Sequence, residues 1–431
     1  MNNHRTTIEQ CDVLVVGAGP AGSMAARVAA REGAMVLLVE RRSQIGVPEQ
    51  CAGYVAQAIR RHVDLPRECV AQAVSRLRTW LPDGTSHLVE MPGYLLNRAS
   101  LDRFLALQAV QAGARLLLRS TFQEFREPAP AGRAQTGGSP VSPSQPVAGG
   151  IPSEASASGL RVASGLRVGP GLRVGARHAS PAQAGRDSQL PVAGRRRFEP
   201  LEAVLMSEGR EVLVKAGVVI GADGPRSSVA HRLGLAPGVL ARAVQYEVVL
   251  GSKLEEAEVF FGPLFPGGYA WLFPAGATAR VGAAFLSGAG AGREGLAQLR
   301  RDLEDQGRIT GSALSYTAGF VPVGGPRPAR HGNVLLAGDA AGHTHPITGA
   351  GILNGMIAGE MAGRAAARAA LSGDSSVLDE YEEEFQIVLG PALERAREKR
   401  EGLNRAWQSG PEGLSQSIRE NWIAFDEYYS R

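Results

Sequence analysis

Two glycine-rich runs near opposite ends of the chain have the composition of loops that bind phosphates. The first is Gly17-Ala18-Gly19-Pro20-Ala21-Gly22, and the second is Gly338-Asp339-Ala340-Ala341-Gly342, which Pro346 and Gly349-Ala350-Gly351 follow. One such run carries little information, because glycine turns are common. Two runs so far apart in the sequence predict a single cofactor long enough to be held at both ends.

The first run has the context of a dinucleotide-binding turn. Residues 12–16 end in four consecutive apolar side chains, which predict a buried strand of a parallel sheet. Gly17 permits a tight turn, Gly19 lets the backbone approach a pyrophosphate, and Gly22 lets a helix over 20–31 pack closely on the strand. That helix opens with Pro20 and Ala21, and its N-terminus favours the phosphates because of its free N–H groups and dipole.

An acidic residue completes the pattern. A second predicted strand, 35–39, ends at Glu40, where a ribose hydroxyl needs an acceptor, and Arg41 follows as a further cofactor-binding candidate. Strand, turn, helix and acid together predict a dinucleotide fold in which Glu40 recognises the adenine ribose. A chance glycine turn is the alternative, and the pattern alone does not separate FAD from NAD.

Further motifs carry a family resemblance. Residues 219–228, with Asp223, and residues 333–342, with Asp339, resemble the second and third FAD motifs of the flavoprotein monooxygenase and reductase superfamily. Within it, Gly268-Tyr269-Ala270-Trp271-Leu272-Phe273-Pro274 and Pro346-Ile347-Thr348-Gly349-Ala350-Gly351-Ile352 are similar to geranylgeranyl reductases. The resemblance covers most of the chain apart from the tip, an internal insert and the far C-terminus. It implies that the cofactor is FAD.

The second glycine run is expected to hold the flavin end of FAD. Asp339 follows Gly338 after a predicted strand, where it can accept hydrogen bonds from ribityl or ribose hydroxyls; an ordinary helix N-cap is the alternative. Gly349, Ala350 and Gly351 open a predicted helix that starts at Ile352. Its N-terminus would face the N1–C2=O edge of the flavin and stabilise the negative charge that reduction places there.

Two other cofactor residues rest on the resemblance. It implies that Arg98 lies near the flavin, with a solvated surface arginine as the alternative. It also implies that Asp223 supports the cofactor region as much as it touches the cofactor.

Four residues are candidates for the reactive side of the flavin. The resemblance places Cys51 on a loop beside the isoalloxazine, to tune the flavin or position the substrate; a small packing residue is the alternative. Tyr269 and Trp271 alternate along a predicted strand and share one face, which suits a polyprenyl chain, although core packing predicts the same pattern. His345 forms an HxH pair with His343. We expect no metal there and interpret His345 as a proton donor.

The resemblance implies an FAD-dependent oxidoreductase that reduces carbon–carbon double bonds of a prenyl, geranylgeranyl-type chain by hydride transfer from flavin N5. Placement of the alkene in a dry pocket would dominate catalysis. The chain lacks an evident second Rossmann fingerprint, so the electron donor, NAD(P)H or a ferredoxin-like protein, stays open. The alternatives are a monooxygenase that hydroxylates an aromatic or polyketide-like substrate and a flavoprotein that only transfers electrons.

The composition of the chain limits which partners and which cellular compartment we expect. The net charge is +4 and no basic stripe is interleaved with aromatics, so we expect no nucleic-acid partner. The chain shows no secretory signal or apolar span, and its three cysteines form no CxxC pair. We therefore expect a cytoplasmic protein that binds a prenyl lipid or another apolar small molecule, with peripheral contact at the inner membrane face as an option.

The predicted fold class is α/β, with a discontinuous Rossmann-like FAD-binding domain, a β-sheet substrate domain and a helical C-terminal tail. The predicted FAD-binding pieces are 8–60, 94–127, 198–236 and 318–375. The substrate domain is expected over 61–93 and 237–317, and the tail over 376–431. Residues 128–197 are rich in Pro, Gly, Ala, Ser and Arg and repeat Gly-Leu-Arg-Val three times, which predicts a disordered insert between hairpin strands.

Overall fold

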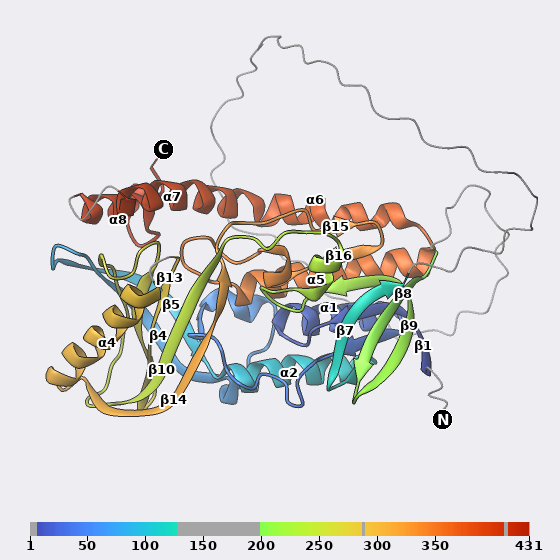
Figure 1. Cartoon of the computed structure of the whole chain (residues 1–431), viewed down its shortest axis with the longest axis horizontal. Helices are drawn as coiled ribbons and strands as arrows, with labels where there is room; N and C mark the ends of the chain where they lie inside the picture. Colours follow the sequence, from blue (N-terminus) through green and yellow to red (C-terminus); the bar gives the residue numbers. More distant parts are fainter. Residues whose placement is uncertain (1–6, 127–198, 287–288, 409–412, 431) are drawn as a thin grey trace, which may run out of the picture. The chain divides into compact units, whose positions relative to one another are not determined.

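The structure is a computed structural model that describes residues 7–126, 199–286, 289–408 and 413–430. Within these ranges the strands form two eight-stranded sheets (Figure 1). The predicted insert, 128–197, lies outside the described residues, but the strands on either side of it are described. These are β7 (Ser120–Arg126) and β8 (Leu201–Ser207), which pair antiparallel as predicted.

The first sheet has the strand order of a Rossmann fold. Its parallel core runs β6-β2-β1-β9-β16, with β1 in the middle and later strands added on both sides. β15 pairs antiparallel with β16, and β8 with β9. The bounds are β1 (Thr7–Val16), β2 (Val36–Val39), β6 (Arg115–Leu117), β9 (Arg210–Gly221), β15 (Arg330–His331) and β16 (Val334–Leu336). Ligands of such sheets bind beyond the carboxyl ends of the parallel strands.

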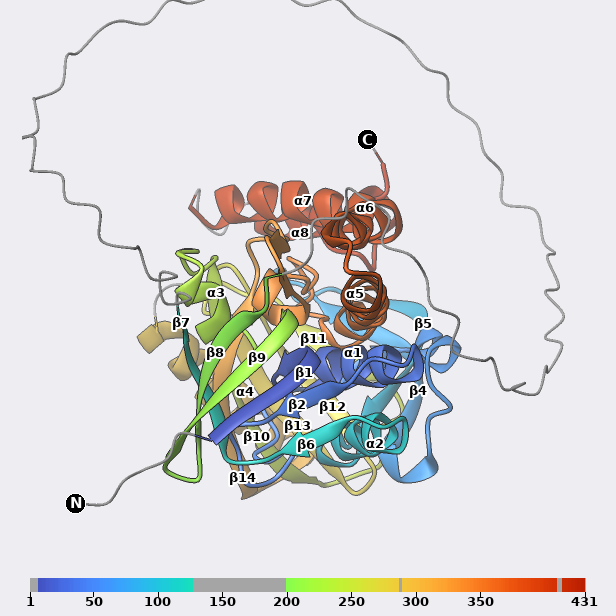
Figure 2. The same cartoon turned by 90° about the vertical axis from the view of Figure 1, so that its right-hand side faces the viewer.

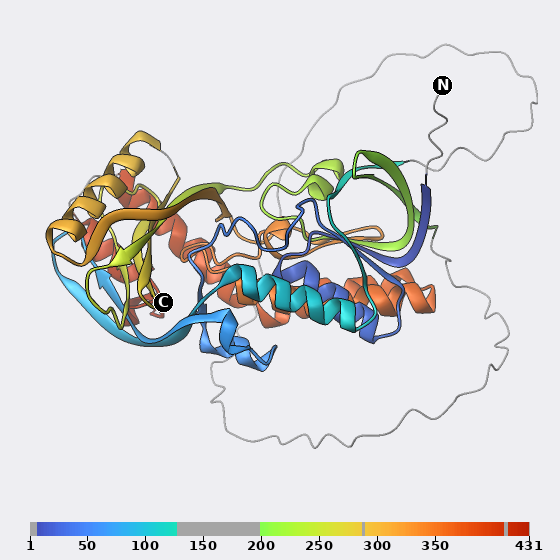
Figure 3. The same ribbon diagram turned by 90° about the horizontal axis from the view of Figure 1, so that it is seen from below.

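Helix α1 (Pro20–Arg31) is confirmed at its predicted bounds and packs against α5 (Ile352–Ser372), as Figure 2 shows. The approach is close because α5 presents glycines to α1. A Cβ at Gly359 would lie 2.2 Å from the Ala21 carbonyl oxygen, and one at Gly363 would lie 2.4 Å from the Ala25 carbonyl oxygen. This contact brings the two glycine-rich runs together. Figure 3 shows α2 (Arg98–Gln111) beside α1.

The second sheet is built from strands of two separate stretches of the chain, residues 54–96 and 240–322. Its order is β14-β10-β13-β12-β11-β4-β5-β3, antiparallel except for β11 and β4. The bounds are β3 (Tyr54–Ala56), β4 (Val70–Trp80), β5 (Ser86–Leu96), β10 (Leu240–Leu250), β11 (Ala257–Phe260), β12 (Tyr269–Ala275), β13 (Thr278–Phe285) and β14 (Ile309–Pro322). The predicted domain limits at 94 and 318 fall inside β5 and β14, which run on without a break.

Two of the remaining α-helices lie between residues 228 and 305, and three lie near the C-terminus. α3 (Ser228–Arg232) and α4 (Ala289–Asp305) precede α6 (Asp379–Val388), α7 (Gly390–Gln408) and α8 (Leu414–Asn421). The aromatic residues after α8 do not continue a helix. Trp422 ends α8 in an extended conformation, and only a 3-10 turn, Asp426–Tyr428, follows. Trp422 and Tyr428 are nevertheless buried, whereas Tyr429 is exposed.

Candidate FAD and substrate site

A cavity of about 980 Å³ lies where residues of the two sheets meet. Its lining includes four of the predicted cofactor residues: Arg41, Arg98, Asp223 and Asp339. Six arginines and four carboxylates line it altogether. This excess of positive charge favours an anionic ligand such as a dinucleotide diphosphate.

The first glycine-rich run, residues 17–22, lies beside this cavity, and its glycines allow close contacts that no side chain would permit. Gly17 has a φ of 103°, and a Cβ there would lie 2.4 Å from the Ala222 carbonyl oxygen. A Cβ at Gly22 would lie 1.8 Å from the Gly17 carbonyl oxygen, so this position admits no side chain. A Cβ at Gly19 would meet no atom of the protein within 4 Å. The space beside Gly19 is therefore open, which fits the approach of a pyrophosphate to the N-terminus of α1.

Glu40 closes the turn from the end of β2. Its Oε2 accepts a hydrogen bond from the Ala18 N–H (3.0 Å) and its Oε1 accepts one from the Arg42 N–H (2.9 Å). The carboxylate is thus held in a fixed orientation while each oxygen retains a free lone pair. That arrangement is compatible with the proposed bond to a ribose hydroxyl.

Asp223 and Asp339 present acceptors at the cavity. Asp223 Oδ2 accepts from the Ser228 N–H and hydroxyl (both 2.7 Å), whereas its buried Oδ1 has no hydrogen-bond partner. An unpaired buried oxygen is costly, and a ligand hydroxyl would satisfy it. Asp339 accepts from the Thr344 hydroxyl (2.7 Å), and burial raises the pKa of its carboxyl group. These acceptors, the open space at Gly19 and the positive lining together fit FAD.

The flavin loop, defined as residues 346–351, leads into α5 with Gly351 as its N-cap. Two side-chain hydrogen bonds hold it: Arg400 of α7 donates to the Pro346 carbonyl (2.7 Å), and Tyr269 donates to the Thr348 carbonyl (2.6 Å). Arg400 also donates to the Gly267 carbonyl (2.6 Å), just before β12. Arg400 is 6% exposed, and burial lowers its pKa to about 10. Gly349 has a φ of 66°, and Ala350 is exposed.

Arg98 begins α2 and is paired within that helix. Its guanidinium donates to both carboxylate oxygens of Asp102, at 2.9 Å for Oδ2 and 3.0 Å for Oδ1. Burial lowers the pKa of Arg98, but the charge of Asp102 and its hydrogen bonds outweigh burial and raise it, so Arg98 stays cationic. It is a partly buried cation at the cavity and not a solvated surface arginine.

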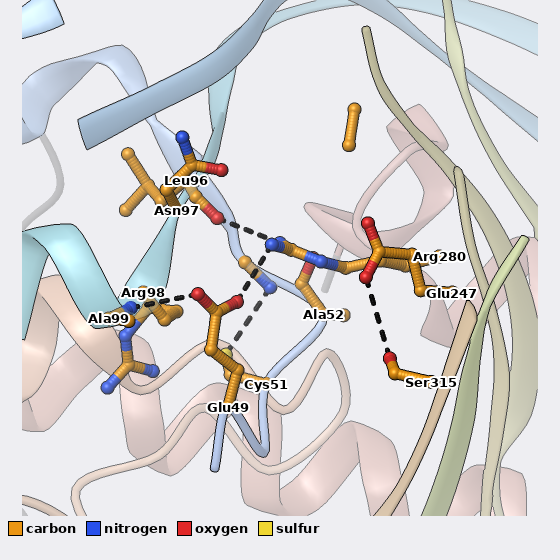
Figure 4. Close-up of polar contacts among 12 residues, drawn as sticks. Glu49, Cys51, Ala52, Leu96, Asn97, Arg98, Ala99, Glu247, Arg280 and Ser315 are labelled. Atoms are coloured by element: carbon orange, nitrogen blue, oxygen red, sulfur yellow. Dashed lines mark hydrogen bonds and ion pairs between the residues drawn. The ribbon is translucent and has the colours of Figure 1, made fainter. Parts of the chain in front are cut away.

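Cys51 lies in a segment, residues 49–53, that accepts hydrogen bonds from side chains of the second sheet (Figure 4). Gln245 of β10 donates to the Cys51 carbonyl (3.4 Å), and Arg280 of β13 donates to the Ala52 carbonyl (3.1 Å). The Cys51 sulfur itself accepts from the Gly53 N–H (3.4 Å). Of the three cysteines, all free, Cys51 is the one that is not buried.

Tyr269 and Trp271 share a face of β12, as the alternation predicts. Their rings lie 6.1 Å apart, and Trp271 donates to the Gln245 side chain (3.3 Å). Trp422, from the C-terminal segment, covers Tyr269 at 5.1 Å between ring centroids. Tyr269 and Trp271, here called the aromatic wall, belong to a packed core and do not line the cavity.

The two histidines of the HxH pair have different surroundings. The His343 ring is buried and stacks on Phe385 at 4.0 Å, and its Nδ1 accepts from the Gly338 N–H (3.2 Å). His345 Nδ1 accepts from the Thr348 N–H (3.3 Å) inside the flavin loop's own turn. Burial lowers the pKa of His343 to about 3 and that of His345 to about 4, so both rings are neutral at pH 7. A proton donated by His345 would have to come from a neutral imidazole.

Several residues that organise the site were not identified from the sequence: Glu49, Gln245, Arg280 and Arg400. Each is polar and lies in a run that otherwise reads as strand, loop or helix, so its role depends on contacts with distant segments. The available signal was Arg280, a charge within the apolar run 279–285. Among the described residues, no three His, Cys, Asp or Glu side chains lie close enough to hold a metal ion.

The comparisons with known proteins agree with this geometry. Residues 12–76 match the model of the FAD dependent oxidoreductase family. The chain is 31% identical to the digeranylgeranylglycerophospholipid reductase of Methanothrix thermoacetophila, with 96% of this chain and 93% of that protein aligned. The chain belongs to the geranylgeranyl reductase family. This member is accordingly an FAD-dependent oxidoreductase.

Solved structures show the same fold. The crystal structure of a geranylgeranyl bacteriochlorophyll reductase-like protein from Thermoplasma acidophilum aligns with a TM-score of 0.70 at 22% identity, covering 96% of this chain and 97% of that one. The OxyS anhydrotetracycline hydroxylase from Streptomyces rimosus aligns with a TM-score of 0.58 at 17% identity, over 97% of this chain and 75% of that one. At these identities the likeness concerns the fold. The predicted α/β class, with its helical C-terminal region, is thus confirmed for this geranylgeranyl reductase family member.

Proposed function

We propose that this enzyme reduces carbon–carbon double bonds in the prenyl chains of a geranylgeranyl-type lipid. One observation carries the proposal: the aromatic wall, the flavin loop and the Cys51 segment are hydrogen-bonded into a single unit. Tyr269 bonds to the Thr348 carbonyl, and Trp271 bonds to Gln245, which bonds to the Cys51 carbonyl. The relative from Methanothrix thermoacetophila, matched over most of both chains, is named as a reductase of such a lipid.

FAD in its reduced form would supply the hydride, held by Gly17, Gly19 and Glu40 at the adenosine end and by Asp339 and the flavin loop at the other. An isolated alkene offers no carbonyl for a protein group to polarise. The contribution of this chain is therefore placement of the double bond and exclusion of water.

A proton must reach the second alkene carbon. We assign Cys51 as the first candidate donor because its thiol is half-buried and lies near the Arg98 charge. His345 is the second candidate, and its neutral ring makes it the weaker acid. Replacement separates them: Cys51→Ser is expected to slow alkene reduction by roughly tenfold or more, and His345→Gln by less.

An anaerobic product analysis tests the function. The enzyme, loaded with FAD and reduced with dithionite, is mixed with a geranylgeranylated glycerophospholipid, and the lipid mass is measured. A gain of two hydrogens per double bond supports the proposal. A gain of one oxygen on admission of air would show a monooxygenase instead, and an unchanged lipid would leave electron transfer alone.

The electron donor and a membrane contact are further parts of the proposal. No helix in the described ranges is long and apolar enough to cross a bilayer. A prenyl lipid would then be reached by peripheral contact, which flotation with anionic and neutral vesicles would measure. Stopped-flow bleaching of the flavin by NADPH, NADH or reduced ferredoxin would identify the donor.

A further inference from the structure

Arg280 is a buried cation on an otherwise apolar strand. The residue is 7% exposed, and its neighbours in β13, Ala279 and Val281, are fully buried. Burying a guanidinium costs free energy unless an ion pair and hydrogen bonds compensate for the lost water. The contacts of Arg280 therefore decide its role.

Arg280 does not pair with the acidic residue nearest to it in its own sheet. Glu247 lies directly opposite Arg280 in the β10–β13 register, yet its carboxylate accepts from Thr278 (3.1 Å) and Ser315 (3.5 Å). The Arg280 guanidinium instead reaches out of the sheet to Glu49, at 3.0 Å from Oε2 (Figure 4). An ion pair within the sheet was available, so its absence indicates that Arg280 serves the Cys51 segment.

The guanidinium brackets Cys51 on both sides. Nη2 binds the side chain of Glu49, two residues before Cys51, and Nη1 binds the carbonyl of Ala52, one residue after it. Nη1 also donates to the Leu96 carbonyl (2.8 Å), at the end of β5. The fit is close, because a Cβ at Gly53 would lie 2.2 Å from Nη1. These bonds limit both ends of the segment that carries the thiol.

Glu49 extends the contact to α2. Its second oxygen, Oε1, accepts from the Ala99 N–H (3.0 Å), in the first turn of α2. The N-cap residue of α2, Asn97, makes no side-chain capping bond, so Glu49 supplies the carboxylate that a helix N-terminus favours. Arg98 opens this helix. The orientation of Arg98 toward the cavity thus depends on the same pair.

We propose that the Arg280–Glu49 pair is a positioning device that sets the Cys51 thiol and the start of α2 against the flavin. Neither residue reacts. The device transmits the position of the substrate-facing sheet to the flavin side, since Arg280 lies opposite Phe273 of the aromatic strand β12. The inference concerns the site of the proposed function, but its geometry does not depend on which lipid is reduced.

Thiol alkylation tests the pair directly. In the FAD-bound enzyme, the rate of iodoacetamide modification at Cys51 is followed by peptide mass, with buried Cys11 and Cys69 as internal references. Arg280→Gln and Glu49→Gln should each raise the rate roughly fivefold or more, and the double variant should not exceed the larger single effect, because one interaction is lost in all three. Arg280→Lys, which keeps the charge but not the planar fork, should lie between wild type and Arg280→Gln.

Glu247→Gln is the matched control. It removes the carboxylate that lies opposite Arg280 in the β10–β13 register but outside the pair, and its Cys51 rate should stay within about twofold of wild type. Equal rates in wild type, Glu49→Gln and folded Arg280→Lys would overturn the proposal, as would a Glu247→Gln effect as large as that of Glu49→Gln. If the alkylation pattern is as expected but no prenyl lipid gains hydrogen, the pair stands and the proposed substrate falls.

Discussion

The glycine turn over residues 17–22 and the Cys51 segment, residues 49–53, belong to the two ends of the proposed site, and different kinds of contact hold each of them in place. At the turn, backbone meets backbone: Gly22 and Gly17 approach so closely that a single methyl group would collide. At the Cys51 segment, long side chains span the gap, with Arg280 reaching Glu49 across 231 residues of sequence. A site made of backbone contacts forbids side chains, whereas a site made of side-chain contacts depends on their donors and acceptors. The two regions should therefore fail differently when they are mutated.

The largest expected effect is at the turn. Gly22→Ala places a Cβ 1.8 Å from the Gly17 carbonyl oxygen, and the strand and helix must separate to admit it. We expect a loss of about 3 kcal/mol or more in the free energy of unfolding, together with loss of FAD. Urea unfolding and flavin absorbance measure both.

Gly19→Ala sharpens this result as a paired variant. Its Cβ meets no protein atom, so the fold should keep its stability while FAD affinity falls by roughly tenfold or more, because the methyl group occupies space beside the predicted pyrophosphate. Equal destabilisation by the two variants would show that the space beside Gly19 is structural and not a ligand site.

The next largest effect is expected where a buried side chain, that of Arg400, holds the flavin loop. Arg400→Met removes the donor of two buried bonds and leaves the Pro346 and Gly267 carbonyls without that partner. We expect about 2 kcal/mol of destabilisation and a changed flavin absorption spectrum, since the flavin loop loses its tie to α7. Arg397→Met in the same helix, whose partners Glu394 and Glu401 are on the surface, serves as control and should change stability by less than about 1 kcal/mol. Equal losses in both variants would contradict the role of Arg400.

A smaller effect is expected for Glu40→Gln. The amide retains an acceptor oxygen for the Ala18 N–H, but a neutral acceptor binds a ribose hydroxyl more weakly than a carboxylate does. FAD affinity should fall by roughly tenfold, measured by fluorescence titration of the apoprotein, with little change in melting temperature. An unchanged affinity would remove Glu40 from the FAD site.

The last expected effect is a pH dependence. Burial lowers the pKa of His345 to about 4, below the ordinary value of 6.5, so the unfolded state binds the extra proton first as pH falls. Stability is therefore full above pH 6.5 and declines between pH 6.5 and 4, by up to about 1.4 kcal/mol per pH unit for this group. His345→Gln should reduce the pH dependence of the urea midpoint over that window, and the buried ring of His343, whose pKa burial lowers to about 3, should account for the part that remains. A wild-type midpoint that does not change from pH 7 to 5 would contradict the burial of this ring.

Local pattern determined much of this protein. The strand, turn and helix around Gly17, the helix opening at Ile352 and the hairpin of β7 and β8 could be predicted from short segments. In each case neighbouring residues dictate the geometry: apolar runs make buried strands, and glycine permits turns and close approach. The family resemblance rests on these motifs as well.

Tertiary structure alone decided how the ends of the site meet. The sequence does not show that the Trp422 ring packs on Tyr269, that Arg400 binds the flavin loop, or that Arg280 pairs with Glu49 and not with Glu247. A buried polar side chain is satisfied by whichever partner the fold brings within about 3 Å, and that partner can come from any point in the chain. The parts of the site that depend on backbone contacts can therefore be predicted from the sequence. The parts that depend on side-chain contacts are decided only when the fold places the two sheets together.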